Sequence, residues 1–344
     1  LPDANTSGHR PWTVSPAHPD PAYFEPVDHL LDVAEHLGLV LAALPAWGYY
    51  IIDRPAFDPD LARAYGRFLG QRYQHRPNLI WVVGGDRVPV GAEPIFHALA
   101  RGLREGGSRQ LISYHPSGGR SSASYFHDAE WLDFNMIQTW TDWPTIYPAV
   151  QADTFRTPVK PVVLAEGAYE NGPEYPLGPI TPLLVRRQAW WTFMAGGYFT
   201  YGQDQMWRMG AGWASTFDTP GAAQMALFRQ IAARLPWWQR VPDQTLFASG
   251  VGSERTLNAA VRSPSGDWAL LYLSGQQHVL VPLEKVLTRN VRLTWINPAT
   301  GESKDAGTYP TGNRTGEPFP QGHSQWYTTP GYWEDALLML EGQD

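Results

Sequence analysis

The chain has 344 residues, a formal net charge of -7 and a hydrophobic share of 43%. It contains no cysteine, which excludes disulfides, thiolate metal sites and a cysteine nucleophile but leaves the cellular location open. Arginine is spread along the chain without a basic stripe, which argues against a nucleic-acid-binding protein, and no stretch is apolar enough to cross a bilayer. The 16 Trp and 16 Tyr residues predict a large core and an aromatic-lined cleft.

Helical and strand patterns alternate from the start of the chain. Residues 25–38 predict a helix with one apolar face and a terminal glycine, and the continuous apolar run 39–47 is typical of a strand buried on both faces. The same unit then repeats several times, which predicts an α/β barrel or a doubly wound sheet. The further elements that we expect are helices at 58–73, 93–105 and 181–195 and strands at 79–83, 111–114, 134–138, 161–167 and 197–201.

The pattern changes after an amphipathic helix at 222–235. From about residue 245 the apolar segments are short, alternating and separated by hairpin signals, which predicts a small antiparallel β domain. Trp268 and Trp295 alternate as strand core residues would, so we expect no clear exposed aromatic platform there. The predicted division is an α/β domain at 1–240 and a β domain at 241–344.

The strand count before the β domain is six, two fewer than a closed barrel requires. Either the missing pair precedes Leu1 or the sheet is open. The chain begins LPDANTSGHRP, with neither an initiator Met nor a signal peptide, and this start favours the first alternative.

Two carboxylates follow buried strands. Asp86 comes just after the strand at 79–83, and Glu166 ends the strand at 161–167. The carboxyl ends of parallel strands are where α/β folds build their sites, and in an eight-stranded ring these two positions would converge above the axis. Each residue alone also suits a turn or a helix start. Their occurrence together favours the paired carboxylates of glycoside hydrolysis.

Residues of types that bind sugars lie at other strand ends. Aromatic side chains stack on sugar rings, and amides and imidazoles form hydrogen bonds with sugar hydroxyls. Each of them alone is equally typical of core or rim. His9 and Arg10 would join them if a strand preceded Leu1. The candidate substrate-binding residues are His9, Arg10, Trp47, Tyr114, His115, Gln138, Trp140, Tyr201 and Gln203.

No cofactor or metal is predicted. The histidines are scattered, and neither HxH nor HExxH spacing occurs. The glycines before Asp86 do not form a phosphate loop, because neither GxGxxG nor GxxxxGK[ST] is present.

The motifs GHRPW, LPAWG, RPNLIWVVGGDR, SYHPSGGRSS, DFNMIQ and RRQAWW, in this order, resemble the apiosidase-like glycoside hydrolases of glycoside hydrolase family 140 from about His9 to Trp238. The resemblance implies a (β/α)8 TIM barrel of the clan A type, here without its first two strands. It also implies that Asp86 is the general acid/base and Glu166 the nucleophile. The remainder resembles the small antiparallel β-sandwich that has been labelled collagen-binding.

These observations lead to the hypothesis of a retaining glycosidase that cleaves a pentose linkage, apiose-like or furanosidic, in plant-type oligosaccharides. His115, Gln138 and Tyr201 would hold substrate hydroxyls and the nucleophile. A companion chain or a second copy completing the barrel stays open, as does a location inside or outside the cell. The alternatives are a carbohydrate-binding protein without turnover and a matrix-binding adhesin that acts through the β domain.

Overall fold

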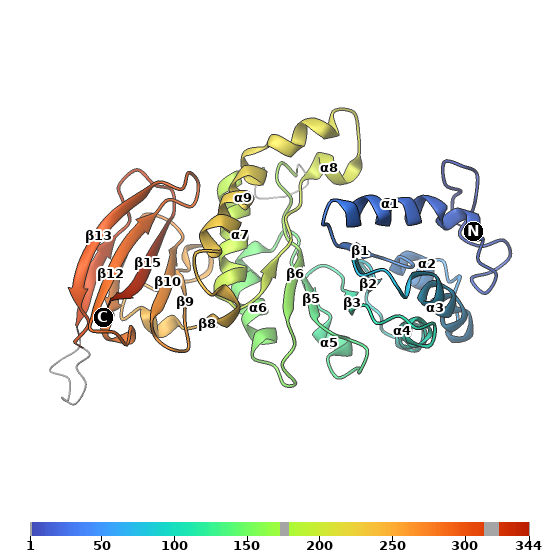
Figure 1. Ribbon diagram of the computed structural model, residues 1–344, viewed down its shortest axis with the longest axis horizontal. Helices are drawn as coiled ribbons and strands as arrows, with labels where there is room; N and C mark the ends of the chain where they lie inside the picture. The colour runs from blue at the N-terminus through green and yellow to red at the C-terminus, as the bar shows by residue number, and fades with distance from the viewer. Residues whose placement is uncertain (1, 173–178, 313–322, 344) are drawn as a thin grey trace. The chain divides into compact units, whose positions relative to one another are not determined.

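The computed structural model of the protein describes residues 2–172, 179–312 and 323–343 (Figure 1). Two compact units make up the chain. The first consists of Leu1–Gln138 with Thr157–Pro161, and the second of Thr139–Arg156 with Val162–Asp344.

A parallel three-stranded sheet lies at the centre of the first unit. Its strands are β1 (Leu41–Ala43), β2 (Leu79–Gly84) and β3 (Ile112–His115), in this spatial order. Leu41 pairs with Leu79, and Trp81 pairs with Ile112. Among the described residues, β1 has a strand partner on one edge only.

The helices of the first unit begin and end close to the predicted positions. Asp58 caps α3 (Pro59–Tyr73), because its carboxylate accepts the Leu61 N–H at 2.8 Å. The remaining elements of this unit are η1 (Pro21–Phe24), α1 (Glu25–His36), α2 (Gly48–Ile52), α4 (Glu93–Glu105), α5 (Ala123–Phe126) and the antiparallel pair β4 (Arg120–Ser121) and β5 (Asn135–Gln138).

Helices α3 and α4 touch through their backbones. Gly66 and Gly70 on α3 face Gly102 and Gly106 on α4. A Cβ atom at Gly66 would lie 2.4 Å from the Leu99 carbonyl oxygen, and one at Gly102 would lie 2.2 Å from the Arg63 carbonyl oxygen. Only glycine permits this approach, and the helix pair is therefore fixed in register.

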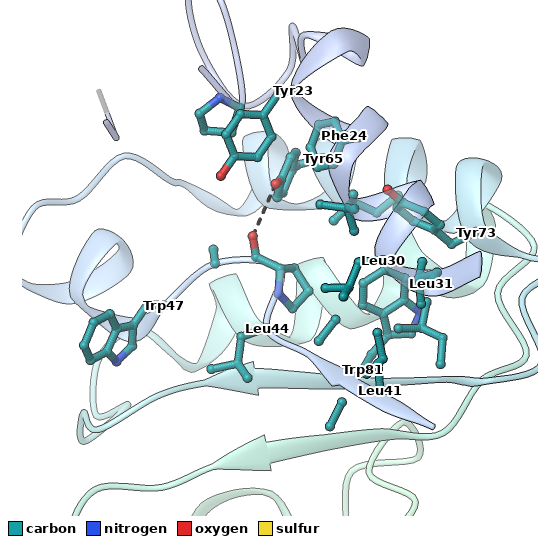
Figure 2. Close-up of a pocket in the computed structure, with 18 of the residues that line it drawn as sticks. Tyr23, Phe24, Leu30, Leu31, Leu41, Leu44, Trp47, Tyr65, Tyr73 and Trp81 are labelled. Atoms are coloured by element: carbon teal, nitrogen blue, oxygen red, sulfur yellow. Dashed lines mark hydrogen bonds between the residues drawn. The ribbon is translucent and has the colours of Figure 1, made fainter. Parts of the chain in front are cut away.

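An apolar cavity of about 440 Å³ opens beside β1 in the first unit (Figure 2). Aromatic and aliphatic side chains from α1, β1 and α3 line it, and the Tyr65 hydroxyl at its wall donates to the Pro45 carbonyl. Two of the large apolar side chains that line it, Leu30 and Leu44, are exposed, as are Val33 on α1 and Leu37, Leu39 and Val40 between α1 and β1. This face of the sheet is therefore incompletely covered by the described residues.

The α/β part of the second unit contains the parallel strands β6 (Val162–Glu166) and β7 (Tyr198–Phe199), in which Val163 pairs with Tyr198. Helix α7 (Pro182–Met194) is buried along most of its length and carries two fully buried tryptophans. Further elements here are η2 (Trp143–Thr145), α6 (Ile146–Thr154), α8 (Asp204–Arg208), η3 (Trp213–Asp218), α9 (Pro220–Ala232) and η4 (Trp237–Gln239).

An antiparallel β domain ends the second unit. Its six-stranded sheet has the order β13-β12-β15-β10-β9-β8 (Figure 1). The inner face of this sheet packs on the pair β11–β14. The bounds are β8 (Val241–Pro242), β9 (Ala259–Arg262), β10 (Trp268–Leu273), β11 (His278–Pro282), β12 (Asn290–Ile296), β13 (Ser303–Pro310), β14 (Ser324–Thr328) and β15 (Ala336–Gln343), with η5 (Gln244–Leu246), η6 (Glu254–Thr256) and η7 (Leu283–Lys285) between them.

A buried ion pair joins α7 to the β domain. The Arg186 guanidinium donates to both carboxylate oxygens of Asp335 at 2.8 to 2.9 Å, and both side chains are almost fully buried. The Tyr272 hydroxyl donates to the same carboxylate at 2.9 Å. Two residues of α7 extend the contact, since Trp191 donates to the Leu257 carbonyl and Trp190 stacks on Tyr272.

The predicted alternation of helices and strands and the antiparallel β domain are confirmed by these elements. The closed barrel stays a prediction, because the parallel pairs of the described residues, β1-β2, β2-β3 and β6-β7, do not by themselves form a closed ring. Trp268 and Trp295 are buried as expected. Trp326 on β14 is 56% exposed, and the expectation that the β domain has no clear exposed aromatic platform stays a prediction. None of the helices in the described part of the chain has the length and apolar character of a membrane span.

Candidate active site

An unusual turn carries Asp86 out of β2. Gly84, Gly85 and Asp86 all have positive φ angles, of 91°, 113° and 53°. A Cβ atom at Gly84 would lie 2.5 Å from the Tyr114 ring, and one at Gly85 would lie 2.3 Å from the Trp47 ring. Glycine is therefore required at both positions. Asp86 itself sits in the left-handed region, a strained state that is common at functional sites.

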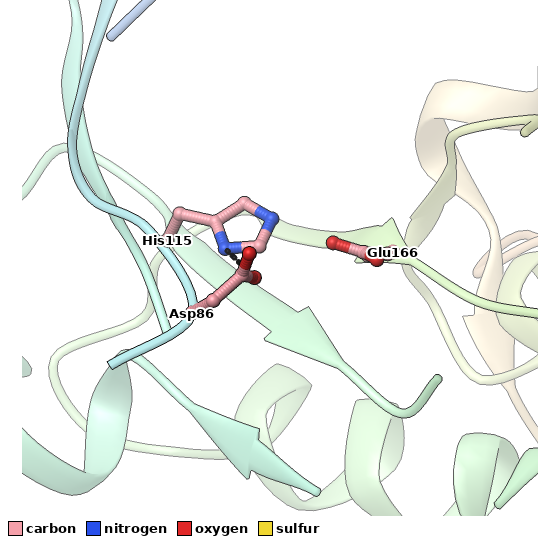
Figure 3. A group of neighbouring side chains, drawn as sticks. All are labelled: Asp86, His115 and Glu166. Atoms are coloured by element: carbon pink, nitrogen blue, oxygen red, sulfur yellow. Dashed lines mark ion pairs between the residues drawn. The ribbon is translucent and has the colours of Figure 1, made fainter. Parts of the chain in front are cut away.

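The Asp86 carboxylate has two polar neighbours in the first unit. Gln138 Nε2 donates to Asp86 Oδ1 at 3.1 Å. His115 Nδ1 lies 3.8 Å from the same oxygen and 3.0 Å from the Pro116 carbonyl oxygen (Figure 3). Gln138 is buried, and its Oε1 has no hydrogen-bond partner among the described residues. The carboxylate is thus oriented by an amide and an imidazole from the ends of β5 and β3.

The turn after Asp86 is anchored from both sides. The Arg87 guanidinium donates to Asp53 at 2.5 Å and to the Asp86 carbonyl at 3.1 Å. The Tyr114 hydroxyl donates to the Arg87 carbonyl at 2.8 Å. Tyr114 is fully buried, so its contact in this structure is with the backbone of the turn. Trp47 packs its ring on Gly85 and exposes about half of its surface, as a sugar platform would.

Glu166, in the second unit, is the last residue of β6 (Figure 3). Its carbonyl accepts the Thr139 N–H at 2.9 Å and the Trp140 N–H at 3.3 Å. The next turn is held from α7, because the Gln188 amide accepts the Ala168 N–H at 2.8 Å and donates to the Ala168 carbonyl at 3.1 Å. The backbone that presents the Glu166 carboxylate is therefore fixed on both sides of the residue.

The other candidates of the second unit differ in exposure. Trp140 has a φ of 49° and is exposed. The Tyr201 hydroxyl donates to Glu170 Oε2 at 2.5 Å, and burial together with the Glu170 carboxylate raises the pKa of Tyr201. Gln203 is buried and caps α8, since its Oε1 accepts the Met206 N–H at 2.8 Å. Its Nε2 has no partner among the described residues.

His9 and Arg10 lie in the loop that begins the first unit. His9 Nδ1 is 2.9 Å from Asp20 Oδ2, and the Arg10 guanidinium donates to the Pro2 carbonyl. These contacts fold the loop on itself. Within the first unit, the side chains of Asp86 and His115 offer two potential metal-ligand atoms that lie 3.8 Å apart.

Sequence reasoning missed three residues that shape the site: Arg87, Glu170 and Gln188. Gln188 had a usable signal, because it is a polar residue within the apolar run QAWWTFMA and therefore needs a buried partner. Arg87 and Glu170 had none, since charged residues in loops are usually solvated.

Two family models match the chain. The family model of the apiosidase-like catalytic domain matches residues 1–239, and the model described as "Putative collagen-binding domain of a collagenase" matches residues 241–341. A search of the curated proteins found no match.

Several solved structures share the fold. A glycoside hydrolase family 5 protein from Bacteroides vulgatus ATCC 8482 is 24% identical with a TM-score of 0.84, over 93% of this chain and 74% of that chain. A second structure, titled "Glycoside hydrolase", is 23% identical with a TM-score of 0.84, over 94% of this chain and 78% of that chain. At these identities the likeness concerns the fold alone.

Proposed function

Because the chain belongs to the apiosidase-like family and is a glycosidase, we propose that it hydrolyses its substrate with retention of configuration. Asp86 serves as the general acid/base and Glu166 as the nucleophile. The substrate is a pentose glycoside, with an apiose-like or furanosidic linkage, in a plant-type oligosaccharide.

The reaction has two steps. Asp86 protonates the glycosidic oxygen while the Glu166 carboxylate attacks the anomeric carbon, so that the leaving group departs as an alcohol and a glycosyl ester forms. Asp86, now ionised, removes a proton from water, and this water displaces Glu166 from the sugar. The mechanism requires the two carboxyl groups to stand about 5 to 5.5 Å apart across one substrate.

The observation that carries the proposal is the junction of Gln138 and Thr139. Gln138 donates to the Asp86 carboxylate, and Thr139, the next residue, donates its N–H to the Glu166 carbonyl. One peptide bond therefore joins the residue that contacts the Asp86 carboxylate to the residue that contacts the Glu166 backbone. This continuity supports the assignment of both carboxylates to a single reaction centre.

The test is a screen of aryl glycosides and pectic oligosaccharides with the wild type, Asp86→Ala and Glu166→Ala. Hydrolysis by the wild type and its loss in both variants, by a factor of about 10³ or more, is expected. Glu130→Gln, which changes an exposed carboxylate, should retain full activity. NMR of the first product should show the anomer of the substrate.

Azide separates the two roles. In Glu166→Ala, azide attacks the anomeric carbon directly and should give a glycosyl azide of inverted configuration. In Asp86→Ala, azide attacks the glycosyl ester on Glu166 and should give the retained product from an activated aryl glycoside. Full activity of either variant would contradict the roles proposed for Asp86 and Glu166. A wild type that binds oligosaccharides without hydrolysing any would favour a carbohydrate-binding protein.

We also propose that two further strands pair with the open edge of β1 and complete the barrel. These strands would come from polypeptide outside residues 1–344, and a companion chain and a second copy of this chain are two possible sources. The uncovered cavity and the exposed apolar residues around it support this proposal (Figure 2). The chain alone should bind a hydrophobic dye and exchange its β1 amides quickly. A monomer with neither property would contradict it.

A further inference from the structure

We propose that the segment Gly202–Asp218 is a glycan-binding loop, in which the exposed indole of Trp207 stacks on a sugar ring beyond the one that is cleaved. The inference rests on the proposed function and concerns only the second unit. It assigns a binding role to a residue outside the candidate catalytic and substrate-binding set.

The base of this loop is closed by one buried carboxylate. Glu170, which is 1% exposed, accepts the Tyr201 hydroxyl at 2.5 Å, the Thr219 hydroxyl at 2.8 Å and the Gly221 N–H at 2.9 Å. Tyr201 precedes the loop, and Thr219 and Gly221 follow it. Both ends of the loop are therefore tied to a residue four positions after Glu166.

Backbone pairing strengthens this connection. The Glu170 N–H donates to the Gly202 carbonyl at 2.9 Å, and the Asp204 N–H donates to the Glu170 carbonyl at 3.0 Å. Because β6 and β7 run parallel, the loop leaves the sheet at the same end as the Glu166 side chain. A substrate that extends from Glu166 within this unit would meet the loop.

Trp207 is held in a defined orientation on α8. Its side chain is 57% exposed, while its Nε1 donates to Asp204 Oδ1 at 3.4 Å. The Arg208 guanidinium lies 4.6 Å from the ring centroid and pairs with the same Asp204 at 3.2 Å. A large aromatic surface that is fixed before binding loses little entropy when a ligand stacks on it.

The surroundings of Trp207 suit a sugar. Exposed Met209 and Phe217 lie on the same loop, and α8 contacts η3, the helical turn that carries Phe217. The Asp204 carboxylate lies at the edge of the indole and the Arg208 guanidinium lies over its ring, so we propose that the sugar stacks on the opposite face. A flat apolar face bordered by polar groups matches a ring with apolar C–H faces and equatorial hydroxyls.

The test compares Trp207→Ala with Trp238→Ala. Trp238 is also well exposed, at 66%, but it follows Trp237, whose ring contacts Tyr198 at the opposite, amino end of β7. We expect Trp207→Ala to raise the KM for long pectic oligosaccharides about tenfold, with kcat and the rate on a short aryl glycoside unchanged. Trp207→Phe should raise this KM by a smaller factor, and Trp238→Ala should have the same KM as the wild type. Equal KM values in Trp207→Ala and the wild type would overturn the proposal.

Binding without turnover separates this inference from the proposed function. The same oligosaccharides are titrated into the Glu166→Ala protein with and without Trp207→Ala. A weakening of about tenfold that requires the Trp207 change supports the platform even if the wild type hydrolyses nothing. The same affinity in both proteins, or no binding to either, refutes it.

Discussion

At the scale of single residues, the orientation of the Asp86 side chain is set by the residues that pack around its turn. Gly84 and Gly85 adopt positive φ angles without a steric penalty, but the positive φ of Asp86 is costly because this residue has a Cβ. The Tyr114 hydroxyl, the Trp47 ring and the Arg87 side chain enclose the turn and fix its path. The geometry of the carboxylate therefore depends on how these three side chains pack against the turn.

Gly85→Ala should lower kcat/KM on the best glycoside about tenfold to a hundredfold. The new Cβ would lie 2.3 Å from the Trp47 ring, and the backbone φ of 113° is one that alanine rarely adopts. Gly91→Ala is the matched control, since Gly91 has a φ of 85° but open space around it. Gly91→Ala should cost stability in urea unfolding without a comparable loss of rate. Equal kinetic losses in the two variants would contradict this account.

The pH dependence of stability offers a second test at this scale. The guanidinium groups of Arg63 and Arg67 lower the pKa of Glu105 to about 2 from its ordinary 4.5. Because the folded-state pKa is the lower one, the pair stabilises the fold above about pH 4.5, and this contribution is lost as the pH falls toward 2. Urea midpoints of Glu105→Gln should vary less with pH across this window than those of the wild type. Parallel profiles would exclude the effect.

At the scale of elements, the packing of α3 on α4 depends on the four-residue spacing of glycines in both helices. The spacing places the small residues on one face of each helix, and the backbones then approach until a carbonyl of one helix occupies the space of a side chain on the other. Helix α4 also contacts β2, so its position bears on the strand that precedes Asp86.

Gly102→Ala should destabilise the protein by about 1–3 kcal/mol, because the Cβ would overlap the Arg63 carbonyl. An exposed helix would instead gain roughly 1 kcal/mol from this change. Arg101→Ala, on an exposed neighbour in α4, should stay within about 0.5 kcal/mol of the wild type. Urea unfolding distinguishes the two signs, and a stabilised Gly102→Ala would refute the close contact.

The elements that sequence could predict are those with a local signal. The cap at Asp58 and the helix at 93–105 follow from side chains within a few residues, and both are present as expected. The pairing of β11 with β14 joins residues about fifty positions apart, and no local pattern specifies it. The positive φ of Asp86 and Trp140 arises from tertiary neighbours, and the burial of Tyr114 arises because β3 is covered on both faces.

At the scale of the whole molecule, the second unit is held together by the Arg186–Asp335 ion pair. A buried pair need not add net stability, but the loss of one partner leaves an unpaired charge in the core. The Tyr272 hydroxyl and Glu334 share the same pair, so that it forms part of a satisfied network.

A double-mutant cycle measures this coupling. Asp335→Leu and Arg186→Met alone should each cost about 3–5 kcal/mol in the free energy of unfolding, because each strands the opposite charge. The double variant should cost clearly less than the sum. Strict additivity of the two changes would show that the residues do not depend on each other.

Helix α7 has a further consequence, because Arg186 and Gln188 stand two positions apart on it. Arg186 forms an ion pair with Asp335 of the β domain, while Gln188 forms hydrogen bonds with the turn that follows Glu166. The β domain therefore supports the helix that holds the turn beside Glu166, and cutting the chain near residue 240 would leave the buried Arg186 guanidinium without its carboxylate partner. If the β domain is replaced by another one, α7 must be replaced with it, because the buried Arg186 would otherwise lack a carboxylate partner.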